Sequence, residues 1–165
     1  MQGSWQRIVL AATEIAGSPA LLRDASKLGF KMNDMQWREF FVTCARLLGG
    51  GDADINSSPS WCSWTTFKRL SEDAGYWQSG LPHLNEIKDH GTADGGTWGQ
   101  PFNYQDIAHF IIPKVFSREL LASLDDRRTF ERMVVNQDIE ALSRQLTKQG
   151  VPHTLSAAAL EIRLC

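Results

Sequence analysis

The fold is decided by the stretch Ile107-Ala108-His109-Phe110-Ile111-Ile112-Pro113. Successive side chains of a strand point to opposite faces of a sheet, and here both resulting faces are largely apolar. Such a run is typical of a strand buried in the middle of a sheet. Pro113 lacks the backbone donor that a central strand needs, so we expect the strand to end there. The sequence therefore predicts a sheet with residues 107–112 as its central strand.

Two further elements are predicted nearer the C-terminus. The stretch Leu160-Glu161-Ile162-Arg163-Leu164 alternates apolar and charged residues, which predicts a strand with one face in water. Before it, Asn136 is expected to cap a helix that ends at Gly150 and carries the pair Glu140 and Arg144 on its outer side. Its inner side is formed by Ile139, Leu142 and Leu146.

The N-terminal half predicts helices. Residues 4–16 and 18–28 place apolar side chains at helical spacing. A third helix is expected to start at Asn33 or Asp34 and to stop at the glycines 49–51, with one apolar face formed by Trp37, Phe41, Cys44 and Leu48. A fourth is expected between Ser63 and Gly75. We predict one α+β domain over residues 1–165, mainly helical in its N-terminal half, with a small sheet formed by its C-terminal half.

Size and composition fit a globular protein. The chain has 165 residues, 42% of them hydrophobic and 22% charged, which is enough to bury a core. No apolar run approaches the roughly 20 residues that span a bilayer, and the N-terminus lacks the pattern of a secretory signal. The three cysteines, Cys44, Cys62 and Cys165, include no close pair and are expected to be reduced. These features predict a cytoplasmic protein that does not engage membranes.

The charges are weak and evenly spread. The formal net charge is −2; residues 1–90 carry nine basic and ten acidic groups, and residues 91–165 carry eight and nine. Direct binding of nucleic acid relies on a basic patch or stripe that follows the phosphate backbone. This sequence has none, so we expect no direct contact with nucleic acid.

Cys62 is the strongest candidate for catalysis. It stands just before the fourth predicted helix, where the positive end of the helix dipole lowers a thiol pKa. With His109 as base and Asp106 as orienting carboxylate, it would supply the parts of a papain-like or amidase-type Cys/His hydrolase. Against this, the segment Trp61-Cys62-Ser63-Trp64 matches no such family, and a thiol between tryptophans is typical of core packing. A lone histidine on an apolar strand is likewise more often a hydrogen-bonded core residue than a catalyst.

Two other patterns carry little chemical content. The side chains of His83, Asp89, His90 and Asp94 lie within a short span, but their spacing is not a known ligand pattern and indicates a hydrated loop. The glycine-rich segment 95–99 lacks the lysine of a phosphate-binding loop. We therefore expect no metal site and no cofactor.

The loop-rich middle of the chain holds the candidates for a protein-binding surface. Aromatic residues on loops are common at interfaces, and acidic residues would meet a basic partner. The alternatives are tryptophans that cover the core and carboxylates that only face water. The candidate residues are Asp52, Asp54, Trp61, Trp64, Glu72, Asp73, Trp77 and Trp98.

Four segments of the last third carry a family resemblance. They are Tyr104-Gln105-Asp106-Ile107-Ala108-His109-Phe110-Ile111-Ile112-Pro113, Asn136-Gln137-Asp138-Ile139-Glu140-Ala141-Leu142-Ser143, His153-Thr154-Leu155-Ser156 and Leu160-Glu161-Ile162-Arg163-Leu164. In these segments the chain resembles immunity proteins of contact-dependent growth inhibition and related bacterial polymorphic toxin systems. The resemblance implies a cytoplasmic protein that binds a cognate protein toxin, often a nuclease, and blocks its active site or its access to substrate. It transfers no individual binding residue, and the weak net charge departs from what masking a strongly basic nuclease requires.

Binding is therefore favoured over catalysis. The leading hypothesis is an immunity or antitoxin-type protein that is not an enzyme and neutralises a toxin domain by binding it. The first alternative is the Cys/His hydrolase. A third hypothesis, a structural or regulatory subunit, differs from the first only in its partner.

Overall fold

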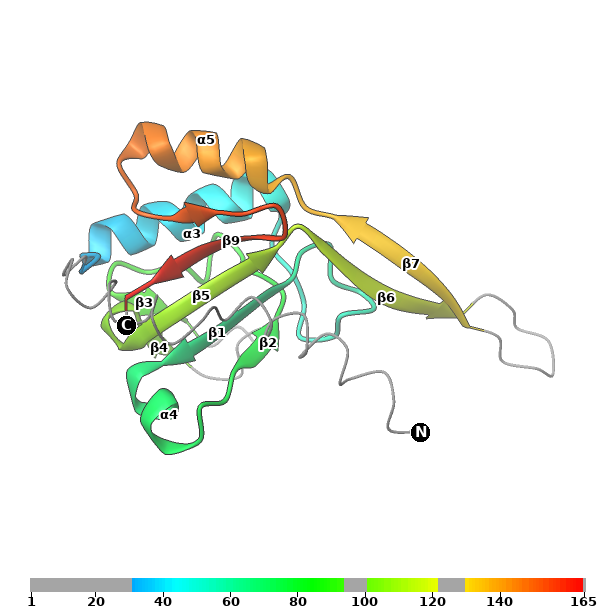
Figure 1. Ribbon diagram of the computed structural model, residues 1–165, viewed down its shortest axis with the longest axis horizontal. Helices are drawn as coiled ribbons and strands as arrows, with labels where there is room; N and C mark the ends of the chain where they lie inside the picture. The colour runs from blue at the N-terminus through cyan, green and yellow to red at the C-terminus, as the bar shows by residue number, and fades with distance from the viewer. Residues whose placement is uncertain (1–30, 94–100, 122–129, 165) are drawn as a thin grey trace.

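The computed structural model describes residues 31–93, 101–121 and 130–164, and its centre is an antiparallel sheet of five strands in the order β2-β1-β5-β9-β8. Helices α3 (Asp34–Leu48) and α5 (Ile139–Gln149) cover one face of this sheet (Figure 1). The strands are β1 (Cys62–Thr66), β2 (Trp77–Ser79), β5 (Ile107–Pro113), β8 (Thr154–Leu155) and β9 (Ala159–Arg163).

Smaller elements surround this two-layer body. The short helix α4 (Phe67–Glu72) follows β1, and the single turn η1 (Tyr104–Asp106) leads into β5. Strands β3 (Gly91–Thr92) and β4 (Phe102–Asn103) form a two-stranded ladder. Strands β6 (Val115–Leu121) and β7 (Phe130–Asn136) form a hairpin that extends away from the body (Figure 1). None of the helices in the described ranges is long and apolar enough to cross a membrane.

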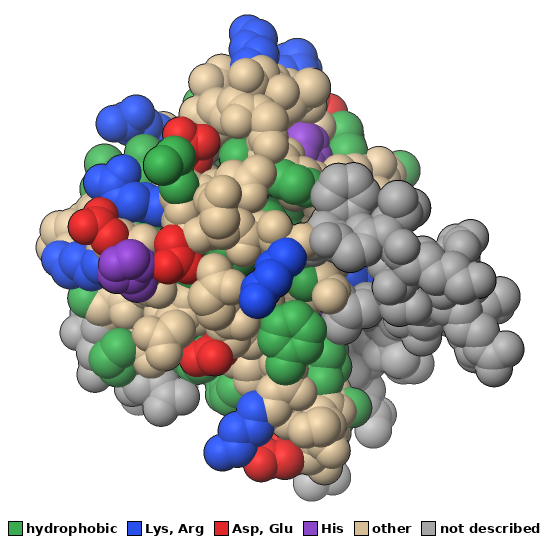
Figure 2. All heavy atoms as spheres, turned by 90° about the vertical axis from the view of Figure 1, so that its left-hand side faces the viewer, with side chains coloured by type: hydrophobic (Ala, Val, Ile, Leu, Met, Phe, Trp, Pro, Cys, Tyr) green, Lys and Arg blue, Asp and Glu red, His purple; other side chains and the backbone are tan. Residues whose placement is uncertain are grey.

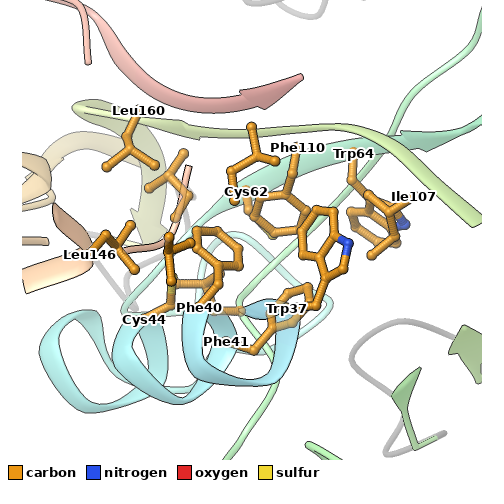
Figure 3. Packing of buried hydrophobic residues seen from close by; sticks show 14 of the residues in the cluster. Trp37, Phe40, Phe41, Cys44, Cys62, Trp64, Ile107, Phe110, Leu146 and Leu160 are labelled. Atoms are coloured by element: carbon orange, nitrogen blue, oxygen red, sulfur yellow. The ribbon is translucent and has the colours of Figure 1, made fainter. Parts of the chain in front are cut away.

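The prediction of a central strand is confirmed. Strand β5 lies third of five and pairs with β1 on one side and with β9 on the other. Its Phe110 contacts Phe40 and Phe41 of α3, with ring centroids 5.3 Å away in both cases. Figure 3 shows these rings with Trp37 between the helix and the sheet. The core therefore forms where the apolar face of α3 meets one side of β5.

The two helices near the ends of the described chain are also confirmed. Asn33 begins α3 with a capping box: its side chain accepts a hydrogen bond from the backbone of Gln36, whose side chain accepts one from the backbone of Asn33. Helix α5 buries Ile139, Leu142 and Leu146 and stops at Gly150, which has φ +69°. Its cap is Asp138, because residue 136 still belongs to β7.

The predicted fourth helix is wrong over its first part. Residues 62–66 form β1, and only Phe67–Glu72 is helical, capped by the Thr66 hydroxyl. The β-branched and aromatic residues Trp64, Thr65 and Thr66 favour a strand, and β5 supplies the backbone partner.

The division of the chain into a helical and a strand-forming half is wrong as well. Two of the five strands, β1 and β2, come from residues 62–79, although the α+β class itself holds. The helices expected over residues 4–16 and 18–28 lie outside the described residues.

Candidate functional site

Cys62 is a buried strand residue. It is the first residue of β1, and its thiol donates a hydrogen bond to the Ser79 carbonyl oxygen at 3.2 Å. Figure 3 shows Cys62 among the aromatic and aliphatic side chains of the core. Burial raises the pKa of this thiol well above its ordinary value. The expected position at a helix start is therefore wrong, and the environment opposes thiolate formation.

The structure separates Cys62 from the two residues expected to activate it. His109 lies opposite Thr65 in the β1–β5 pairing, so these two share one face of the sheet. Cys62 is of the other parity and belongs to the core on the helical face. Asp106 lies exposed on η1, where it accepts a hydrogen bond from Asn103. Side chains alternate between the two faces of a sheet, so the pairing of β1 with β5 places Cys62 and His109 on opposite faces. The sequence alone does not give this pairing.

His109 instead joins a hydrogen-bonded network on the sheet face away from the helices. Its Nε2 lies 3.1 Å from Glu161 Oε2, and its Nδ1 lies 2.8 Å from the Tyr76 hydroxyl. The same carboxylate oxygen accepts a hydrogen bond from Arg163. A carboxylate only accepts, which assigns the proton to Nε2 and makes Tyr76 the donor when the ring is neutral.

The alternation of β9 predicts that Glu161 faces water, but its side chain belongs to this hydrogen-bonded network instead. It is largely buried, and its pKa lies below its ordinary value, first because of the hydrogen bond from His109 and then because of the charges of His109 and Arg163. Both ring nitrogens of His109 are engaged, as in a core histidine. The sequence held no signal for Tyr76, and it missed Glu161 because only the β5–β9 pairing brings that carboxylate to the ring.

Two of the candidate tryptophans are core residues. Trp61 and Trp64 are buried; Trp61 stacks on Phe116 at 6.3 Å, and Trp64 stacks on Trp77 at 6.0 Å. A partner does not reach buried rings without unfolding the sheet, so these two positions follow the alternative in which tryptophan covers the core. Trp77 is only partly buried, and Trp98 lies outside the described residues.

A groove of about 520 Å³ beside α4 is the candidate binding site. Trp77 and Phe102 meet edge to face within its lining, with ring centroids 5.3 Å apart, and the Arg69 guanidinium lies 4.0 Å from the Trp77 ring. The groove collects residues from the end of β1, from α4, β2, β4 and η1, and from the segments that adjoin them. They are Thr66, Phe67, Lys68, Arg69, Glu72, Asp73, Trp77, Pro101, Phe102 and Asp106.

This groove gathers part of the expected interface. Glu72, Asp73 and Trp77 from the predicted partner-binding set line it, together with Asp106. Sequence analysis missed Phe67, an exposed aromatic residue, because it expected the helix to begin earlier. It missed Phe102 because only the β3–β4 ladder places that ring beside Trp77.

The groove carries charges of both signs. Lys68 lies 3.8 Å from Glu72, and Arg69 lies 3.4 Å from Asp73. Figure 2 likewise shows basic and acidic side chains interspersed over the described part of one face of the molecule. The groove thus offers charged groups of both signs beside an apolar surface.

The remaining acidic candidates lie elsewhere. The Asp52 carbonyl accepts a hydrogen bond from Gly80, and Asp54 caps the turn that follows, at the end of β2 away from α4. Here the chain segments at Gly51 and Gly80 cross so closely that a Cβ on Gly80 would lie 2.5 Å from Gly51 backbone atoms. The predicted acidic neighbourhood is therefore split between the two ends of the β1–β2 pair.

The histidine and aspartate cluster has a structural role. His90 Nδ1 lies 2.6 Å from Asp34 Oδ2, and Asp89 lies 3.4 Å from Arg38, so both tie the 83–90 segment to the start of α3. The pKa of Asp34 is lowered, first by the hydrogen bond from Gln105 and then by that from His90. Within the described ranges, no group of three or more potential ligand side chains is placed to hold a metal ion. Asp94 lies outside those ranges.

Comparison with known proteins places the chain in no family: no family model matches the sequence, and neither a curated protein nor a solved structure matches it.

Proposed function

We propose that this chain is an immunity-type protein that binds a cognate toxin domain and thereby blocks it. The groove beside α4 is the proposed contact surface. The observation that carries the proposal is the combination, in one groove, of an exposed Phe67 and a half-buried Trp77 with the charged side chains around them. Aromatic and arginine side chains are enriched at protein interfaces, and the rim around them is polar.

The chemistry of the groove favours a polypeptide as its occupant. Arg69 stacks over Trp77, which leaves a planar cationic surface beside an aromatic one. A partner side chain that fills the groove would contact Phe67 and Trp77, and its neighbours would meet charged lining residues such as Lys68 and Asp106. The proposed inhibition is stoichiometric, because occupancy of the groove holds the toxin surface away from its substrate.

The hydrolase alternative has weaker support. Its nucleophile would be Cys62, which is buried in the core, and its base would be His109, which lies on the opposite face of the sheet. A nucleophile and its base need hydrogen-bond reach of each other. Binding therefore accounts for more of the observed geometry than catalysis does.

The test is co-expression of the full chain with the protein encoded immediately upstream of it. We expect the two proteins to co-purify and the chain to relieve the toxicity of that neighbour. The double variant Phe67→Asp with Asp73→Lys should weaken the complex by about 100-fold, as expected when a hot spot is lost. An aspartate in the first turn of α4 also suits the helix dipole, so the helix should persist.

The matched control is the double variant Asp52→Lys with Asp54→Lys. It changes two exposed carboxylates on the far end of the β1–β2 pair, and we expect affinity within about three-fold of wild type because these carboxylates lie outside the groove. Circular dichroism confirms that each variant is folded. Absence of any complex with the wild-type chain, or a complex weakened only by the control, would overturn the proposal.

A further inference from the structure

The β6–β7 hairpin extends from the body and is tied to it at its base. Its register runs from Val115 opposite Asn136 to Leu121 opposite Phe130. Phe116 stacks on Trp61, and Arg118 donates a hydrogen bond to the Ser58 carbonyl. Figure 1 shows that the two strands continue past the sheet. Much of the hairpin therefore lies outside the body of the protein.

The backbone groups on each edge follow from the pairing. The Gln137 amide donates to the Lys114 carbonyl, which is the bond that flanks a non-hydrogen-bonded pair at Val115 and Asn136. Such pairs alternate along an antiparallel ladder, so the groups of Ser117, Glu119, Arg132 and Val134 point outward. An independent contact agrees, because the outward amide of Glu119 donates to the Asn56 side chain at 2.8 Å.

The two edges differ. The β6 edge meets the 56–58 segment at Arg118 and Glu119. On the β7 edge, the outward backbone groups of Arg132 and Val134 have no hydrogen-bond partner among the described residues. Natural proteins rarely leave a strand edge of this length open, because it is a template for another strand.

The same part of the hairpin carries an exposed apolar row. By parity in the ladder, Val115, Phe130 and Val134 share one face, and their side chains are 46%, 61% and 57% exposed. Met133, on the other face, is 42% exposed. Open backbone groups and exposed apolar side chains thus coincide on β7, which is the combination that marks an interaction surface.

We propose that β7 pairs with β7 of a second copy of this chain, antiparallel and about a two-fold axis, to form a four-stranded sheet β6-β7-β7-β6. Because the 56–58 segment obstructs the β6 edge, pairing ends at two copies and does not propagate into a fibre. The occupant is thus the same surface on another copy.

The charges narrow the choice of register. A two-fold axis at Met133 places Arg132 opposite Val134 of the partner subunit, and both residues have outward backbone groups that pair. An axis at Arg132 or at Glu131 would set two like charges directly opposite each other, which is destabilising. The axis at Met133 avoids both clashes and sets the Met133 side chains of the two copies opposite each other.

The test is the mass of the full chain in solution, measured by sedimentation equilibrium from about 1 to about 200 µM. We expect a reversible shift from the 18.5 kDa monomer to twice that mass. Val134→Lys, which adds a positive charge on the paired edge opposite Arg132 of the partner subunit, should raise the dissociation constant at least about 10-fold. The matched control Val115→Lys changes a valine of the same face on β6 and should alter it less than about three-fold.

A covalent readout tests the register. In a Cys165→Ser background, Met133→Cys should form a disulfide-linked dimer on mild oxidation, because facing residues at the axis lie within disulfide reach. Val135→Cys, which would lie opposite Glu131 of the partner subunit, should not. A wild-type chain that stays monomeric over the whole range overturns the proposal. So do equal effects of the two lysine variants, or equal cross-linking of the two cysteine variants.

Discussion

Replacement of Gln137 by methionine should be one of the most damaging changes of nearly constant volume in this protein. The side chain is buried just after β7. Its Oε1 accepts a hydrogen bond from the Trp61 amide at 2.9 Å, and its Nε2 donates to the carbonyl oxygens of Trp61 and Pro113 at 2.9 and 2.7 Å. One amide thus joins the start of β1, the end of β5 and the segment that leads into α5.

The magnitude follows from these three hydrogen bonds. Each contributes about 0.5–1.5 kcal/mol net, and a buried backbone group left without a partner costs about 1–3 kcal/mol. Methionine fills nearly the same volume, so a cavity adds little. We expect Gln137→Met to lower the free energy of unfolding by about 3–5 kcal/mol, a large part of the roughly 5–15 kcal/mol typical of a domain.

The assay is urea unfolding followed by circular dichroism, with the slope of the transition checked for equality between variants. The matched control is Gln78→Met, an exposed glutamine on β2, for which we expect a change within about 0.5 kcal/mol. A loss below about 1 kcal/mol for Gln137→Met, or similar losses for both variants, would refute the view that this amide holds the strands together.

Two further predictions concern titration and thiols. The pKa of Glu161 lies below its ordinary 4.5, so its stabilisation is present above that pH and is lost as the pH falls through the lower folded value. Glu161→Gln should therefore flatten the fall in stability between about pH 5 and pH 3 in urea titrations, and an unchanged slope would contradict the contribution of His109. In Cys165→Ser, burial of Cys44 and Cys62 should make labelling by a thiol reagent follow unfolding, and labelling much faster than unfolding would contradict their burial.

Local patterns were sufficient for four elements. A cap at Asn33 or Asp34 and the apolar spacing behind it predict α3, and Gly150 marks the end of α5. The doubly apolar run before Pro113 predicts β5, and strict alternation predicts β9. In each case the periodic pattern lies within the element itself, so residues close in sequence are sufficient to predict it.

The strands without such periodicity were missed. The sequence predicts a helix that starts after Ser63, whereas residues 62–66 form β1. These residues carry no strand periodicity of their own, and only their pairing with β2 and β5 makes them a strand. The β6–β7 hairpin was missed because neither of its faces is uniformly apolar, and its strands satisfy each other. Strand pairing joins residues distant in sequence, and a single sequence does not reveal it.

The candidate site divides in the same way. The sequence by itself singled out Glu72, Asp73 and Trp77 by residue type, and the groove brings them together. It also determined the α+β class and the central place of the run before Pro113. Only the tertiary structure decided that Cys62 and His109 lie on opposite faces of the sheet, because the face of a strand residue depends on the register of pairing.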